Sequence, residues 1–97
     1  MNYLERLALE IREELPADAL DQSRLDSLLL EYAVLVLAKG AQVSLEDVHN
    51  AWVAWMTTNG EQHEALVPFE ELPRETQAKD APFVTAIRAV SSRHVRE

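Results

Sequence analysis

Residues 28–38 form the most apolar stretch of the chain, and Glu31 is the only charged residue among these eleven. The stretch is too short to cross a membrane, which takes about 20 residues, so it predicts a buried helix. We place this helix over residues 23–39, with Ser23 as its N-cap and Gly40 as its left-handed stop. A helix that is apolar nearly all round must be covered on several sides.

Two faces of this helix carry apolar side chains. The main stripe follows helical spacing and consists of Leu25, Leu28, Leu29, Tyr32, Leu35 and Val36. Leu30, Val34 and Leu37 lie off that stripe and form a second face. Either the helix lies at the centre of its bundle, which we favour, or the second face packs against another subunit. In the latter case Leu30, Val34 and Leu37 form the interface of a homodimer.

The other apolar patterns also repeat with the period of a helix, and none alternates as a strand does. Longer helices are predicted over residues 2–14, 44–58 and from 80 to about 91, with a short one over 73–78. Ser44 and Asp80 are the expected caps of the last two long helices. The predicted fold is all-α, a compact bundle of four longer helices and one short helix in a single domain over residues 1–97. Residues 17–22 are expected to form a linker, and residues 92–97 a frayed tail.

The segment of residues 66–73 connects the third long helix to the short one. It contains Pro68 and Pro73 and has little propensity for helix or strand. We expect this connector to be extended and packed on the bundle. Phe69 and Leu72 are the side chains expected to hold it by inserting between the helices.

The chain is acidic, and its charge is unevenly distributed. The net charge is −8, with −10 in residues 1–72 and +2 in residues 73–97. An acidic surface repels phosphate backbones, which argues against nucleic-acid binding. The N-terminus lacks the basic stretch and apolar run of a signal peptide, and the absence of cysteine excludes disulfides. We therefore expect a cytoplasmic protein with no membrane association.

Residues that could support catalysis or metal binding are scattered along the chain. His49, His63 and His94 fall in different predicted elements, and none pairs with another at the spacing of helical metal ligands. Gly40 and Gly60 are the only glycines, so the chain has no glycine-rich phosphate loop. No serine stands in a nucleophile motif. The sequence predicts neither an enzyme nor a bound metal or cofactor.

Trp52 and Trp55 lie within one turn of the third long helix, which is a large aromatic mass for a short chain. We favour the interpretation that both rings belong to the core, with their indole N–H groups hydrogen-bonded. The alternative is that one ring lines a groove with His49 or Asn50 and stacks on a planar ligand. The exposure of the two rings distinguishes the two interpretations.

The same segment carries a resemblance to a known family. His49 and Trp52 match a His-x-x-Trp signature, and a second signature follows it in Val67, Pro68, Phe69, Leu72 and Pro73. Together with the helix after Asp80, these residues resemble the RyR domain, a small helical module repeated in ryanodine receptors and found singly in bacterial and phage proteins. The similar region runs from about residue 43 to residue 90. The whole chain also resembles short proteins of actinobacteria and their phages.

The resemblance implies a non-enzymatic binding module that captures or senses a small nucleotide-like molecule by aromatic stacking, in the host cytoplasm if the protein is phage-encoded. Family members commonly carry a stacking tryptophan in an insertion after the His-x-x-Trp helix, whereas residues 61–64 contain no tryptophan or tyrosine here. The stacking surface must then come from Trp52, Trp55 or Phe69, beside His49 and Asn50. The alternative function is protein–protein interaction, with a host protein or a second copy as the partner and no small ligand.

Overall fold

The computed structural model describes residues 1–16 and 25–94. Its helices are α1 (Tyr3–Glu14), α2 (Leu25–Ala38), α3 (Leu45–Thr58), α4 (Arg74–Ala78) and α5 (Ala81–Arg93), with 3₁₀ turns η1 (Gly40–Gln42) and η2 (Phe69–Glu71). No strand occurs within these residues, so the all-α prediction of four longer helices and one short one is confirmed. The predicted linker over residues 17–22 and the Ser23 cap lie outside the described residues.

Local hydrogen bonds explain where α1 and α3 begin. The Asn2 side chain accepts from the Glu5 N–H at 2.9 Å, and the Glu5 carboxylate accepts from the Asn2 N–H at 3.0 Å. Ser44 and Asp47 form the same reciprocal pair at the start of α3. Such capping boxes satisfy amide groups that have no partner inside the helix. Ser44 is therefore the cap that the sequence predicts.

Gly40 ends α2 in the left-handed conformation, with φ +54°. A side chain at this position would be strained by the backbone, and its Cβ would approach the Ser91 hydroxyl to 3.0 Å. The glycine thus allows the turn after α2 to pass close to α5. This explains why the most apolar helix stops where the sequence places its end.

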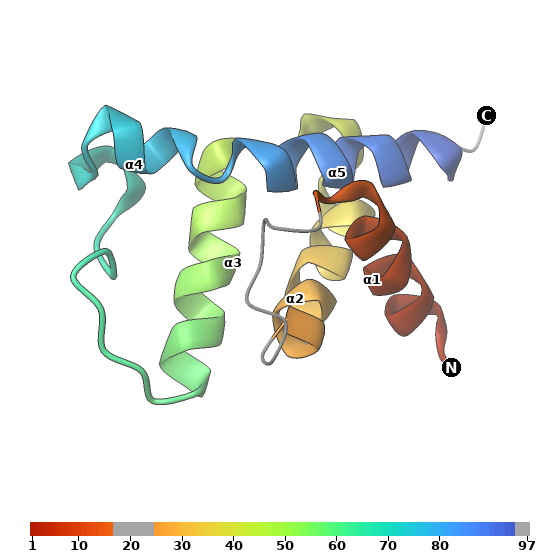
Figure 1. Ribbon diagram of the computed structural model, residues 1–97, viewed down its shortest axis with the longest axis horizontal. Coiled ribbons are helices and arrows are strands. Elements are labelled where there is room, and N and C mark those ends of the chain that lie inside the picture. The colour runs from red at the N-terminus through yellow and green to blue at the C-terminus, as the bar shows by residue number, and fades with distance from the viewer. Residues whose placement is uncertain (17–24, 95–97) are drawn as a thin grey trace.

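α2 occupies the centre of the bundle. It packs against α1, α3 and α5, and α5 runs across the ends of the other three long helices (Figure 1). Most of its predicted stripe is buried, and Leu35 is half-buried against the core. The most deeply buried large side chains come from α1, α2, α3, α5 and the turn before α3: Ile11, Leu29, Tyr32, Val43, Val48, Ile87 and Val90. The preferred prediction of a central α2 therefore holds, but the helix is not covered on every side.

The end of α5 differs from the predicted frayed tail. The helix continues to Arg93, whose guanidinium pairs with Glu14 at 2.6 Å and with Glu10 at 3.5 Å. The His94 ring lies 3.0 Å from Glu10. These contacts with α1 extend the helix beyond the point where its apolar pattern fades. Residues 95–97 lie outside the described part of the chain.

The start of α5 differs as well. Asp80 occupies the N-cap position, and its backbone carbonyl accepts from the N–H groups of Phe83 and Val84. Its side chain makes no capping hydrogen bond. Asp80 is therefore the N-cap residue that the sequence predicts, but it caps through its main-chain carbonyl and not through its half-buried side chain.

The connector is held differently from the prediction. It is not extended throughout, because η2 forms a turn at Phe69–Glu71, and the Phe69 and Leu72 side chains are only half-buried. Two polar side chains bind its main chain instead. Gln77 donates to the Phe69 and Leu72 carbonyls at 3.0 and 3.2 Å, and His49 bonds to the Val67 carbonyl at 2.7 Å. Hydrogen bonds to the backbone suit a segment with few apolar side chains to bury.

Candidate functional site: an aromatic cluster and an apolar face

Trp55 belongs to the core. Its side chain is only 7% exposed, and its indole N–H donates to the Ser27 hydroxyl of α2 at 2.9 Å. An indole that is buried and hydrogen-bonded offers neither a stacking face nor a free donor to a ligand. Of the two interpretations of the tryptophans, the core interpretation therefore applies to Trp55.

Three of the five predicted ligand residues come together with a fourth ring. His49 lies with its centroid 5.9 Å from Trp52 and 6.1 Å from Phe69, and Trp52 meets the edge of His63 at 5.3 Å. We call His49, Trp52, His63 and Phe69 the aromatic cluster. The fifth predicted residue, Asn50, is exposed on α3.

The two histidines of the aromatic cluster are held by the backbone. His49 is 3% exposed, and its Nε2 must carry the proton in the bond to the Val67 carbonyl, because a carbonyl oxygen only accepts. His63 accepts from the Ala65 N–H through Nδ1 at 3.0 Å. His63 was not a predicted ligand residue, and nothing in its spacing from Trp52 indicates the contact. Trp52, half-buried, is the ring of α3 that remains partly accessible.

The pKa values of Tyr32 and Asp80 are shifted by burial and by neighbouring ionisable groups. Burial raises the pKa of the Asp80 carboxyl, while the charge of His49 acts in the opposite direction. Burial also raises the pKa of the Tyr32 hydroxyl, with a smaller contribution from Asp80, so Tyr32 stays neutral. Among the described residues, no deeply buried side-chain nitrogen or oxygen lacks a hydrogen-bond partner. The cluster therefore has no unsatisfied buried group directed at a ligand.

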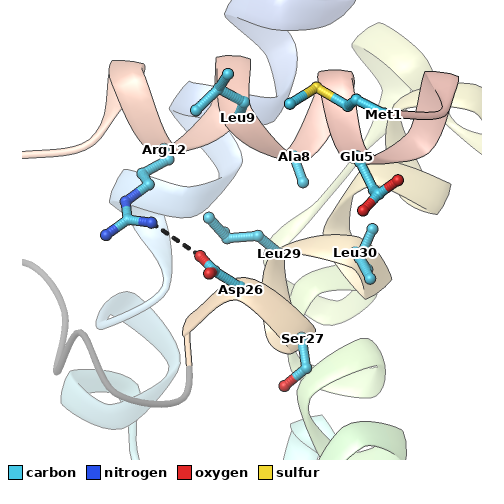
Figure 2. Close-up of a pocket in the computed structure, with 9 residues that line it drawn as sticks. All are labelled: Met1, Glu5, Ala8, Leu9, Arg12, Asp26, Ser27, Leu29 and Leu30. Carbon is cyan, nitrogen blue, oxygen red and sulfur yellow. Dashed lines mark hydrogen bonds and ion pairs between the residues drawn. The ribbon is translucent and has the colours of Figure 1, made fainter.

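The hollows of the surface lie elsewhere, along α1 and α2. One cavity of about 450 Å³ separates α1 from the start of α2 (Figure 2). The side chains of Ala8, Leu29 and Leu30 line it, and an ion pair between Arg12 and Asp26 at 2.8 Å lies at one side. Two further hollows flank α1, and none of the three is lined by a residue of the aromatic cluster.

The predicted interface residues are all exposed. Leu30 is 38% exposed, Val34 47% and Leu37 60%. The described residues contain three more exposed large apolar side chains, and all three belong to α1 or the residues before it. We call the whole set the apolar face: Met1, Tyr3, Leu9, Leu30, Val34 and Leu37. Every one of its members lines one of the three hollows along α1 and α2.

One protein family matches nearly the whole chain. Residues 2–92 match the family model described as a domain of unknown function, DUF7701. The chain belongs to this family. No curated protein and no solved structure matches the chain. The DUF7701 match covers α1 to α4 and α5 up to residue 92, so the aromatic cluster and every member of the apolar face except Met1 lie within the family's domain. It does not bear on the resemblance to the RyR domain, which stays a prediction.

Two further observations concern this DUF7701 chain. Within the described ranges, no helix is long and apolar enough to cross a membrane. The same residues contain no group of three or more histidine, aspartate or glutamate side chains placed to hold a metal ion.

The part of the apolar face that α1 contributes was not predicted from the sequence. Leu9 lies off the buried stripe of that helix, and this was a usable signal. Met1 and Tyr3 gave no such signal, because they precede or begin the helix.

Proposed function

We propose that this domain is a non-enzymatic protein-interaction module that binds its partner on the apolar face. The observation that carries the proposal is the exposure of Leu30, Val34 and Leu37 on one side of a helix whose other side forms the core. Large contiguous apolar patches are uncommon on soluble monomers and mark interaction sites. The α1 members of the face enlarge the patch beyond what one helix could offer.

The energetics favour a covered face. Removing apolar surface from water stabilises a complex by about 25 cal/mol per Å². Leu30, Val34 and Leu37 are held by the folded helix, so binding them costs little additional backbone entropy. A partner that covers them replaces water with apolar contacts and need not break any hydrogen bond of α2.

Photo-crosslinking tests the proposal. A photoreactive phenylalanine analogue replaces Leu37 in the protein expressed in its own cells. We expect a covalent adduct with another polypeptide, because Leu37 is the most exposed member of the face on α2. The same analogue at Thr85, exposed on α5 and outside the three hollows, is the matched control. An adduct at both positions, or at neither, contradicts the proposal.

Capture of a nucleotide-like molecule is the second candidate. The observation in its favour is the half-buried Trp52 ring within the aromatic cluster. Adenosine, which lacks the phosphates that an acidic surface repels, is the probe. In Trp55→Phe, Trp52 is the only tryptophan, and saturable quenching of its fluorescence by adenosine would support the candidate. Unchanged fluorescence at millimolar adenosine would exclude it.

A further inference from the structure

We infer that the partner on the apolar face is a second copy of this chain, with the two α2 helices packed antiparallel about a twofold axis near Val34. The inference rests on the proposed function and names the partner of that surface. It follows from the spacing of the apolar side chains, from the charges at the two ends of the face and from its extent.

The spacing is self-complementary. Leu30, Val34 and Leu37 stand at positions i, i+4 and i+7, so they share one side of α2. With a rise of about 1.5 Å per residue, Leu30 and Leu37 lie roughly 10 Å apart along the helix, with Val34 between them. A twofold axis at Val34 places Leu30 of one copy on Leu37 of the other, and the reverse contact forms at the same time.

The charges at the two ends of the stripe are opposite. Glu5 and Glu31 line the hollow that contains Leu30 and Val34, whereas Arg6 lines the hollow that contains Leu37. Within the described residues, neither Glu31 nor Arg6 takes part in an ion pair.

Other charged groups at the two ends are already paired within the chain. Arg12 pairs with Asp26 near the acidic end, where the Glu5 carboxylate accepts from the Asn2 N–H, and Arg93 pairs with Glu10 near the basic end. Among the described residues, Glu31 and Arg6 have neither an ion pair nor a side-chain hydrogen bond, so their charges remain to be matched by a partner.

The antiparallel arrangement satisfies both ends together. It brings Arg6 of each copy toward Glu31 of the other, whereas a parallel arrangement brings like charges together. The two copies therefore supply all the charges that this electrostatic complementarity requires.

A dimer interface needs more surface than the α2 members of the face supply. A standard interface buries about 800 Å² per partner, about an eighth of the 6379 Å² surface of the chain. Two turns of α2 alone are too small for such an area. The exposed side chains of Met1, Tyr3 and Leu9 on the neighbouring α1 extend it in the same region.

Charge reversal tests the arrangement. Arg6→Glu and Glu31→Arg are prepared separately, and the mass of each is measured by sedimentation equilibrium at low ionic strength and micromolar concentration. We expect the native protein to be a dimer and each variant alone to dissociate at least about tenfold more readily, because both symmetry-related contacts become repulsive. An equimolar mixture should regain the native affinity. In the mixed dimer the introduced glutamate meets the introduced arginine, and the unchanged Arg6 of one copy meets the unchanged Glu31 of the other.

Arg74→Glu and Glu64→Arg are the matched controls. They change the net charge by the same amounts at exposed positions away from the apolar face, so they should dimerise as the native protein does, alone or mixed. Val34→Glu, at the axis, should give a monomer with unchanged circular dichroism.

The outcomes separate this inference from the proposed function. A native monomer overturns the inference, yet a crosslink from position 37 to a different protein would leave the proposed function standing. A native dimer that Val34→Glu dissociates and the charge reversals do not affect keeps the apolar face as the interface and overturns the antiparallel arrangement. Only the recovery of native affinity in the equimolar mixture supports both the apolar face as the interface and the antiparallel arrangement.

Discussion

The His49 side chain could be a ligand-binding group or a buried structural group, and its environment decides between the two roles. A histidine near two tryptophans suggests a ligand site, but here the ring is 3% exposed and donates to the Val67 carbonyl. The bond ties α3 to the connector, and the ring fills the space between Trp52 and Phe69. His49 thus stabilises the fold, whereas the Trp52 ring of the same cluster is only half-buried.

At the same scale, Asp80 is expected to reduce stability at neutral pH. Its pKa is raised in the folded protein, chiefly by burial, so folding disfavours the carboxylate. This cost is present above the raised pKa and is lost as the pH falls below it. Asp80→Asn, which preserves an N-cap residue, should therefore raise the free energy of unfolding at pH 7 by about 0.5–1 kcal/mol, the size of an ordinary single-site effect.

Urea denaturation at two pH values measures this effect. The difference between Asp80→Asn and the native protein should vanish near about pH 3, where the carboxyl is protonated in both states. Glu64→Gln, in the exposed loop, is the control and should leave stability nearly unchanged. A loss of stability in Asp80→Asn at pH 7 would show that the carboxylate is held favourably.

At the scale of elements, the connector is stabilised by polar contacts more than by inserted side chains. Gln77 of α4 donates to two of its carbonyls. Gln77→Leu keeps much of the side-chain volume and removes both donors, so it should cost about 1–2 kcal/mol. Phe69→Ala should cost a similar amount, because the half-buried ring loses only part of the roughly 1.5–3 kcal/mol of a fully buried one.

Chemical denaturation of the two variants checks this prediction. Gln62→Leu, at an exposed glutamine in the loop before the connector, should change the free energy of unfolding by less than about 0.5 kcal/mol. A cost for Phe69→Ala several times that of Gln77→Leu would mean that the ring, and not the hydrogen bonds, holds the connector.

At the scale of the whole molecule, α2 is both the centre of the core and a part of the surface. One side of it contacts three helices, while Leu30, Val34 and Leu37 remain in water. The described part of the chain forms four long helices, so three long helices are available there to cover the central one. The uncovered side of α2 either stays exposed to water or is covered by a second protein molecule. The charge-reversal experiment distinguishes these two states.

Much of the fold follows from local sequence. The helix limits are set by Asn2, Ser44, Gly40 and Gly60, which act through capping bonds to residues three positions on or through a left-handed backbone conformation. The buried stripe of α2 follows from a spacing of three and four residues, which any helix converts into one face. These features could be predicted because each depends on residues close together in the chain.

Tertiary structure determined the environment of the candidate site. Trp52 and Trp55 are three residues apart, yet one is half-buried and the other buried, and Trp55 donates to Ser27 of α2 whereas Trp52 contacts His63 of the loop. The contact of His63 with Trp52, the partial burial of Asp80 and the joining of α1 to the exposed side of α2 all link segments distant in sequence. Burial depends on which other elements cover a side chain, and no local spacing carries that information.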